Sequence, residues 1–284
     1  MKHSINKYIV IKGINRIVVY ALLVLLVLFV LFPFAWIIST SIKPVTEVMT
    51  IPPRWIPDHP TLDNYKNVLF NSSIPRYFLN STAVSFLVGI LSVAVGGVTG
   101  YGLSRKKTRL ANSMSMFILG SQMLPATVIM IPIYLMLTNI HLYDTVWGLA
   151  ISHLILTIPL VTWLCKGYID SIPVDLEEAA QIEGCSRLQS LILIIFPIAA
   201  PGIAASGMYA FVQSWNEFTL ASVLTASDKS RTLPIGLTEF ASLFTIDWGS
   251  IMAAAVIISV PVILIFFFMQ KYLVSGLGQG AVKG

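Results

Sequence analysis

The sequence predicts an all-α integral membrane protein with six transmembrane helices and a helix-turn-helix between the fourth and the fifth. Of its 284 residues, 56% are hydrophobic and 11% are charged, against about 25% charged in ordinary soluble domains. The hydrophobic residues collect in uncharged runs of about 20 residues or more, which is enough to cross a hydrocarbon layer about 30 Å thick. A soluble fold is therefore excluded, and a membrane barrel would instead show short alternating segments.

Six runs have the required length. They contain no Asp, Glu, Lys or Arg except Glu217, and they cover residues 17–38, 78–101, 110–137, 145–165, 198–223 and 249–270. We interpret 17–270 as one six-span domain between an N-terminal segment, 1–16, and a C-terminal tail, 271–284. Twelve of the 18 Lys and Arg residues lie in these two ends, in the loop 102–109 and in the segment 166–197. Since cytoplasmic loops carry the excess of positive charge, both termini are predicted to be cytoplasmic.

The net charge of +5 would favour nucleic-acid binding in a soluble protein. Here the basic residues lie between apolar runs, so the lipid bilayer and its anionic headgroups are the predicted neighbours, and no nucleic-acid partner is expected. The cluster Arg105, Lys106, Lys107 and Arg109 is explained by topology. Cys165 and Cys185 both fall on the predicted cytoplasmic side, so no disulfide is expected.

The second and third runs contain residues that alter helix packing. Gly96 and Gly100 form a G-x-x-x-G pair that admits close approach of another helix, either within the chain or in a second membrane subunit. Pro125 and Pro132 each favour a kink or a broken turn in the third run. Such breaks are tolerated beside a cavity, where Gln122 would face water, although simple packing kinks are an equal alternative.

The loop between the fourth and fifth runs has strong helix punctuation. Asp175 is predicted to cap a first short helix, with Glu178 completing a capping box, and Gly184 to end it in the left-handed conformation. Ser186 then starts a second helix, with Gln189 at the matching position. This helix-turn-helix contains more apolar residues than a short solvated element needs. We therefore expect it to be buried against the chain itself or against a partner.

This loop resembles a known motif. The string Glu178-Ala179-Ala180, then Glu183-Gly184, then Pro197 thirteen residues after the glycine, resembles the EAA loop of ABC importer permeases. Further strings resemble the carbohydrate permeases related to the smaller membrane subunit of the maltose system. These strings are Phe32-Pro33-Phe34, Ser39-Thr40-Ser41, Pro60-Thr61-Leu62-Asp63-Asn64-Tyr65, Gln122-Met123-Leu124-Pro125, Trp215-Asn216-Glu217-Phe218, Thr232-Leu233-Pro234-Ile235-Gly236-Leu237 and Gly280-Ala281-Val282-Lys283-Gly284.

The resemblance implies a permease subunit of an ABC importer for a sugar or oligosaccharide in a bacterial inner membrane. Its EAA-type helix-turn-helix would insert into a cytoplasmic ATPase, and the tail would reach toward the same interface, although composition alone favours a frayed end. The implied partners are a second homologous permease subunit, two ATPase subunits and an extracellular solute-binding protein. No cofactor is expected in this chain, because it has no G-x-x-x-x-G-K-[ST] loop, and the partner ATPase would bind ATP and Mg.

A solute pathway has four candidate residues, Gln122, Trp215, Asn216 and Glu217. Carboxylate and amide groups can bind sugar hydroxyls, and Trp215 can stack on a sugar face. The alternatives for Glu217 are a structural hydrogen-bonding anchor near the outer interface, which we expect, and plain exposure to headgroup water. His153 has no second ligand at a suitable spacing, so a metal site is not expected.

The sequence also bears on three other classes of membrane protein. An intramembrane serine protease is disfavoured because no G-x-S-x-G or G-x-S-G string occurs, and no enzymatic activity is expected. An ion-coupled secondary transporter would show internal repeats and ionisable residues in several spans, whereas only Glu217 qualifies. A membrane scaffold that binds a cytoplasmic protein without moving solute shares the helix-turn-helix and remains an alternative.

Overall fold

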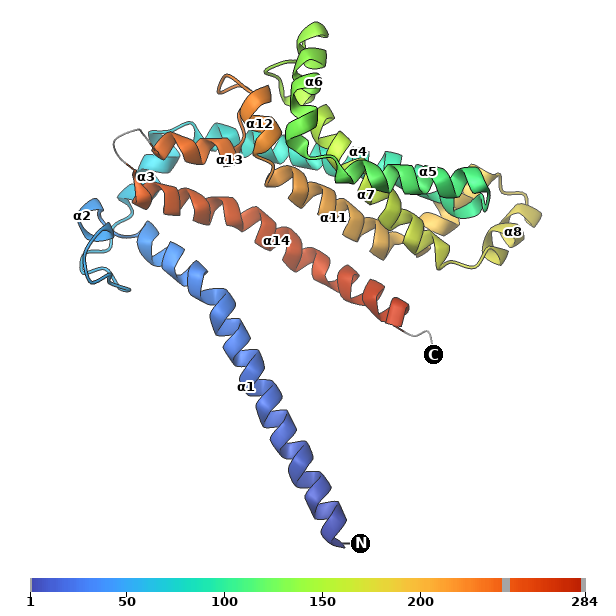
Figure 1. Cartoon of the computed structure of the whole chain (residues 1–284), viewed down its shortest axis with the longest axis horizontal. Coiled ribbons are helices and arrows are strands. Elements are labelled where there is room, and N and C mark those ends of the chain that lie inside the picture. Colours follow the sequence, from blue (N-terminus) through green and yellow to red (C-terminus); the bar gives the residue numbers. More distant parts are fainter. Residues whose placement is uncertain (1, 242–245, 282–284) are drawn as a thin grey trace. The chain divides into compact units, whose positions relative to one another are not determined.

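The computed structural model describes the backbone of residues 2–241 and 246–281, and the side chains of 15–241 and 246–270. The chain forms two compact units, one made of Met1–Asn71 with Leu243–Val256 and the other of Ser72–Ser242 with Ile257–Gly284. Most of the described residues are helical (Figure 1). The predicted all-α class is therefore confirmed.

Within the described residues, four helices are long and apolar enough to cross a membrane, and two bent helix pairs raise the number to six if each pair is one span. The four long segments are Asn15–Ser41 within α1 (Lys2–Ser41), α4 (Ile74–Arg105), α7 (Val146–Asp170) and Trp248–Gln270 within α14 (Trp248–Ala281). Because α14 is helical to Ala281, it includes most of the predicted tail, of which the side chains and residues 282–284 lie outside the described part.

The third predicted span is a bent pair and not one continuous helix. α5 (Arg109–Gly120) and η1 (Ser121–Met123) end before Pro125, and α6 (Ala126–Asn139) continues at an angle of 96°. Leu124 has the extended conformation expected before a proline, with φ −76° and ψ 122°. The predicted break therefore occurs at Pro125, whereas Pro132 lies inside α6 and does not end it.

The fifth predicted span, 198–223, also differs from the structure. The helical stretch Arg187–Ile198 is bent by 82° relative to α11 (Ala200–Trp215). Pro201 lies in the first turn of α11 and has no N–H to continue the helical ladder across the bend. α11 ends at Trp215, and a separate helix, α12 (Thr219–Leu224), follows.

The core of the second unit is the bundle of α4, α7 and α11 (Figure 1). A Cβ atom on Gly96 would lie 2.8 Å from Val161 Cγ1, and one on Gly100 would lie 2.9 Å from the backbone nitrogen of Lys166, so α4 and α7 approach closely at both glycines. The intrachain alternative for the G-x-x-x-G pair is thus confirmed. The second unit also contains α13 (Leu233–Gly236), which contacts α4, and η3 (Leu237–Phe240).

The first unit is organised around Asn64 at the start of α3 (Asp63–Phe70). Its buried amide donates hydrogen bonds to the carbonyls of Ser41, at 2.9 Å, and Lys43, at 2.8 Å. These two carbonyls lie between the end of α1 and α2 (Val45–Val48), and the Lys43 ammonium lies 4.0 Å from the ring centroid of Trp36. The Pro60 to Tyr65 string therefore contains a residue that joins α3 to the end of α1.

Asp144 joins the loop before α7 to the loop after α12 through side-chain hydrogen bonds. Its Oδ1 atom accepts hydrogen bonds from the backbone N–H groups of Ala226, at 2.8 Å, and Ser227, at 3.0 Å, and from the Ser230 hydroxyl. Its Oδ2 atom accepts the Ser227 hydroxyl at 2.7 Å. Partial burial opposes ionisation, but these donors outweigh it and hold the pKa of Asp144 well below its ordinary value of 3.8.

Replacing Asp144 by Asn should lower the stability of the chain by about 2 kcal/mol at neutral pH, because charge-assisted bonds become neutral ones. Asn also tolerates the positive φ of 57° at this position. A lowered folded-state pKa contributes stability above the unfolded pKa, and this contribution is lost as the pH falls. The difference in melting temperature between wild type and variant should therefore shrink below about pH 4. A pH-independent difference would contradict this assignment.

Candidate functional site

The predicted helix-turn-helix is formed by α8 (Asp175–Ile182), Gly184 and α9 (Arg187–Ser190). Gly184 has φ +97°, and its N–H donates to the Gln181 carbonyl at 3.1 Å. The Cys185 N–H donates to the Ala180 carbonyl at 2.9 Å. Together these two bonds form a Schellman motif, which ends a helix with a residue in the left-handed conformation. The predicted role of Gly184 in the local fold is therefore confirmed.

One of the two predicted caps is present. Ser186 and Gln189 form a reciprocal capping box at the start of α9. Asp175, in contrast, caps nothing, because Val174 before it already has helical angles of φ −65° and ψ −31°. An N-cap residue needs a non-helical backbone, and the N–H groups of the first turn donate to the Val174 carbonyl instead. The prediction for Asp175 is wrong.

The helix-turn-helix presents two different faces. Glu178, Ala179, Glu183 and Gly184 are exposed, whereas Ala180 and Glu177 are buried against the chain. Three large apolar side chains are also exposed on this element, Ile182 at 87%, Leu188 at 62% and Leu176 at 42%. Pro197 lies farther along, in the short helix α10 (Phe196–Ile198), and is exposed. The exposed face therefore combines carboxylates with apolar side chains.

A cleft of about 400 Å³ lies beside the break between α11 and α12. It brings together three of the four candidate pathway residues, Gln122, Asn216 and Glu217. Gln213 and Thr219 add further polar groups to the cleft. The other lining residues are Ser121, Leu124, Ala126, Ile129, Ile155, Leu156 and Phe218. The break at Pro125 and the break between α11 and α12 therefore contribute to one cavity. In this cavity, amides and a carboxylate lie among apolar side chains.

Trp215 does not line this cleft. Its side chain is 1% exposed, and its ring packs against Phe78 and Phe211 at centroid distances of 5.8 and 5.6 Å. Its indole N–H donates to the Ile258 carbonyl at 3.3 Å. A solute in the cleft therefore has no access to the face of this ring in the present conformation.

Glu217 is a buried anchor at the end of the cleft. Its carboxylate accepts the backbone N–H groups of Leu220, at 2.8 Å, and Ala221, at 3.0 Å, at the start of α12. His153 Nε2 lies 3.3 Å from Glu217 Oε2, and His153 Nδ1 lies 2.8 Å from Ser214 Oγ. Glu217 thus holds the break and connects α12 to α7. No group of three or more His, Cys, Asp or Glu suited to a metal occurs among the described residues.

The order Ser214, His153, Glu217 matches the residue types of a hydrolytic triad. A nucleophile must reach its substrate, and the Ser214 side chain is buried and is absent from the cleft lining. Its hydroxyl also lies 3.4 Å from that of Ser85, inside the bundle. The chain of bonds therefore fits a buried structural network that joins α4, α7 and α11.

Replacing Glu217 by Gln should destabilise the chain, because the start of α12 loses a charged acceptor and His153 loses the carboxylate that lies 3.3 Å from its Nε2 atom. The expected cost is about 1.5 to 3 kcal/mol, the range for hydrogen bonds to charged groups. The measurement is the melting temperature in detergent. Gln213→Ala is the matched control, since Gln213 lines the same cleft but is exposed, and its melting temperature should not change. A changed solute preference of Glu217→Gln with unchanged melting would contradict the anchor role.

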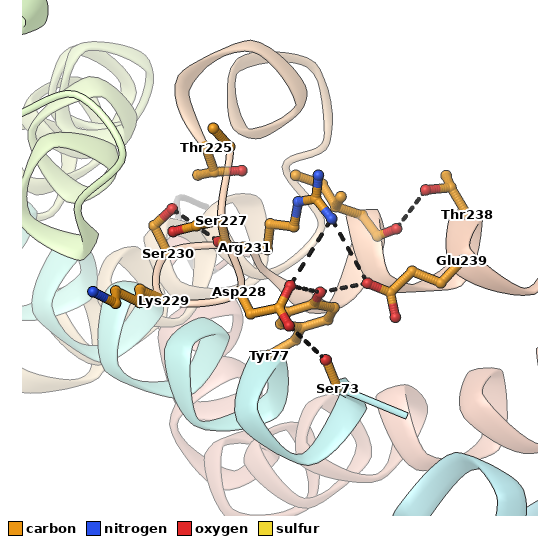
Figure 2. Close-up of polar contacts among 12 residues, drawn as sticks. Ser73, Tyr77, Thr225, Ser227, Asp228, Lys229, Ser230, Arg231, Thr238 and Glu239 are labelled. Atoms are coloured by element: carbon orange, nitrogen blue, oxygen red, sulfur yellow. Dashed lines mark hydrogen bonds and ion pairs between the residues drawn. The ribbon is translucent and has the colours of Figure 1, made fainter. Parts of the chain in front are cut away.

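A polar cluster that sequence reasoning missed lies at the start of α4 (Figure 2). Figure 2 shows the Tyr77 hydroxyl between the carboxylates of Asp228 and Glu239, with its distance to Asp228 Oδ1 at 2.7 Å. Ser73 donates to Asp228 at 2.8 Å, and Arg231 lies 3.8 Å from Glu239. The bonds from Tyr77 and Ser73 lower the pKa of Asp228. Ser73 and Tyr77 lie 151 to 162 positions before the acidic residues that they contact, so no local pattern could have revealed the cluster.

Comparisons with known proteins agree with this architecture. Residues 92–279 match the family model described as "Binding-protein-dependent transport system inner membrane component". The chain is 32% identical over 274 residues to the trehalose/maltose transport system permease protein MalG of Thermococcus litoralis, covering 95% of this chain and 98% of MalG. It is 29% identical over 261 residues to the diacetylchitobiose uptake system permease protein DasC of Streptomyces coelicolor, covering 92% and 95%.

A similar fold occurs in a solved structure. One chain in the crystal structure of a bacterial ABC transporter involved in the import of the acidic polysaccharide alginate superposes with a TM-score of 0.77 at 24% identity. The match covers 91% of this chain and 96% of that chain. The two chains therefore share their fold over nearly their whole length.

Proposed function

This chain belongs to the family of inner membrane components of binding-protein-dependent transport systems, and we propose that it is a permease subunit of an ATP-driven importer for a sugar or an oligosaccharide. The family match carries this proposal, and the names of the relatives, which are sugar permeases, indicate the class of solute. The exposed face of α8 and α9 supports it, because acidic and large apolar side chains on a short solvated element are typical of a docking surface.

The topology follows from taking each bent helix pair as one span. Six spans would leave both termini on the same side of the membrane, and the distribution of Lys and Arg supports the cytoplasm as that side. The helix-turn-helix of α8 and α9 then projects into the cytoplasm, and α9 is the first part of the helical stretch Arg187–Ile198 that enters the fifth span. The loops that hold Asp144 and Asp228 lie on the outer side.

The mechanism is divided between chains. Two cytoplasmic ATPase subunits bind ATP and Mg and hydrolyse the nucleotide, and the exposed Glu178, Ala179 and Glu183 contact one of them. Gly184 keeps the turn compact, Ala180 packs α8 on the chain, and Pro197 leads into the fifth span. A second permease subunit completes the pathway, and an external binding protein delivers the solute. The described part of the tail, up to Ala281, extends the last helix toward the ATPase side.

The cleft beside Glu217 is the proposed part of the solute pathway in this subunit. Gln122 and Asn216 are exposed there and can exchange hydrogen bonds with hydroxyl groups. Glu217 supports the cleft by holding the break between α11 and α12. Trp215 does not line the cleft, but its packing on Phe78 and Phe211 holds the end of α11 in place beside it.

The proposal is tested by reconstituting the complex of both permease subunits and the ATPase into liposomes, with the binding protein outside. Uptake of maltose, trehalose and diacetylchitobiose is measured with ATP or a non-hydrolysable analogue inside. We expect uptake of at least one sugar that requires hydrolysable ATP and survives a protonophore. Uptake driven by an ion gradient without ATP would indicate a secondary transporter. Intact assembly without uptake of any of these sugars would favour a scaffold.

A further inference from the structure

Adjacent glutamates at the start of α8 differ in burial. Glu178 is exposed, whereas the side chain of Glu177 is 5% exposed and is directed into the chain. Both carboxylate oxygens of Glu177 are bonded to the last turn of α4. Arg105 forms an ion pair with Oε1, and the Tyr101 hydroxyl donates to Oε2 at 2.8 Å. Arg105 and Tyr101 are four residues apart, so they lie on one face of that helix.

The Arg105 guanidinium also contacts the end of α7. One terminal nitrogen donates to the Ile169 carbonyl at 3.2 Å, and the other donates to the Ile172 carbonyl at 3.2 Å. The Ile169 carbonyl lies in the last turn of α7 and also accepts the Ile172 N–H at 3.1 Å, and the Ile172 carbonyl lies two residues after the helix. Arg105, the last residue of α4, therefore binds both the end of α7 and α8. Its planar guanidinium group fixes the relative geometry of the three helices.

A second bond chain reinforces the junction between α4 and α7. The Ser104 hydroxyl donates to Asp170 Oδ1 at 2.6 Å, and the Lys166 ammonium lies 2.6 Å from Asp170 Oδ2. With α4 and α7 held together in this way, α8 is attached to both through Glu177. The attachment is made by Glu177, whereas the neighbouring Glu178 is exposed.

Burial determines what this pair contributes. Two charges taken from water pay a desolvation cost that roughly cancels their attraction, so a buried pair contributes little net stability while it strongly disfavours other arrangements. The Arg105 side chain is 15% exposed, and its exposed neighbour Lys107 lies two residues away in the same basic cluster. The basic residues of this loop are thus not equivalent, although topology alone explained all of them.

We propose that Glu177 and Arg105 are a positioning pair that transmits movement of α8 to α4 and α7. This inference rests on the proposed function, because it presumes that an ATPase moves α8. The pair contacts neither solute nor nucleotide. The exposed residues of α8 receive the movement through the partner, and the buried carboxylate of Glu177 passes it to two helices of the transmembrane bundle.

The test uses the reconstituted complex and compares Glu177→Gln, Arg105→Gln and the double variant, with Lys107→Gln as the control. The measured quantity is the amount of sugar transported per ATP hydrolysed, for whichever of maltose, trehalose and diacetylchitobiose the wild type transports. Each single variant should lower this ratio by about tenfold while hydrolysis continues. Because the two residues act through one link, the double variant should be no worse than the poorer single variant. Lys107→Gln should match the wild type.

Two results would overturn the proposal. One is an unchanged ratio in assembled variants whose only defect is a lower melting temperature, which would show a purely structural pair. The other is additive loss in the double variant. If Glu177→Gln does not assemble, Tyr101→Phe removes a single bond to the same carboxylate and should lower the ratio by about two- to threefold; an unchanged ratio there overturns the proposal equally. A wild-type complex that does not couple ATP to uptake would instead refute the proposed function.

Discussion

Replacing Gly184 by Val should abolish coupled transport. The residue has φ +97°, and a β-branched side chain in the left-handed region costs about 1 to 2 kcal/mol locally. No atom lies within 4 Å of a Cβ placed there, so the cost is backbone strain and not a clash. The turn should therefore open, and the face that bears Glu178 and Glu183 should lose its shape. The ATPase subunits should then dissociate, or hydrolyse ATP without uptake.

Two variants control for side-chain volume. Gly167 is also surrounded by open space but lies within α7, so Gly167→Val should have little effect on coupling. Gly184→Asn should retain much of the activity, because Asn adopts the left-handed conformation more readily than other residues with a Cβ. The measurements are co-purification of the ATPase and uptake per ATP. A Gly184→Val complex that assembles and transports at wild-type rates would show that the turn does not couple the subunits.

Replacing Gly100 by Leu should disrupt the bundle itself. A Cβ at this position would lie 2.9 Å from both the nitrogen of Lys166 and the carbonyl oxygen of Thr162. Both are backbone atoms of α7, so the two helices must separate. Overpacking of this kind typically costs about 1 to 3 kcal/mol, and here it also separates the pairs that join α4 to α7. We expect a large fall in the yield of folded protein and in its melting temperature.

Gly102 provides the matched control for this variant. It lies two residues farther along α4, and no atom lies within 4 Å of a Cβ placed on it. Gly102→Leu should therefore melt like the wild type or slightly above it, since Leu is a better helix former than Gly. Equal melting of the Gly100 and Gly102 variants would show that close approach of α4 and α7 at Gly100 is not required for the fold.

Local features were predictable from the sequence because their causes are local. Uncharged runs predicted helices, a glycine after an apolar turn predicted the left-handed residue at Gly184, and a Ser with a Gln three residues later predicted the start of α9. Pro125 predicted a break, but not its angle of 96°, which depends on how α5 and α6 pack. The error at Asp175 arose because its carboxylate fits a capping pattern while Val174 had already begun the helix.

Long-range pairing was not predictable in this way. Glu217 looked like a residue inside a continuous span, whereas it ends up in a break because it accepts the first N–H groups of α12 and faces His153, 64 positions earlier. Arg105 looked like one of several equivalent topological charges, and only its spatial proximity to Glu177 distinguishes it. A single sequence records residue types and spacing, but it does not record which distant side chains meet.

The Schellman motif at Gly184 has a consequence for how the molecule responds to ionic strength. The turn is closed by backbone hydrogen bonds, and α8 is fixed by a buried ion pair, so dissolved salt screens neither of them strongly. The carboxylates of Glu178 and Glu183 are exposed, so any attraction they exert on a basic partner surface weakens as salt is added. Concentrated salt should therefore release the partner while the projection keeps its shape, ready to bind again on dilution.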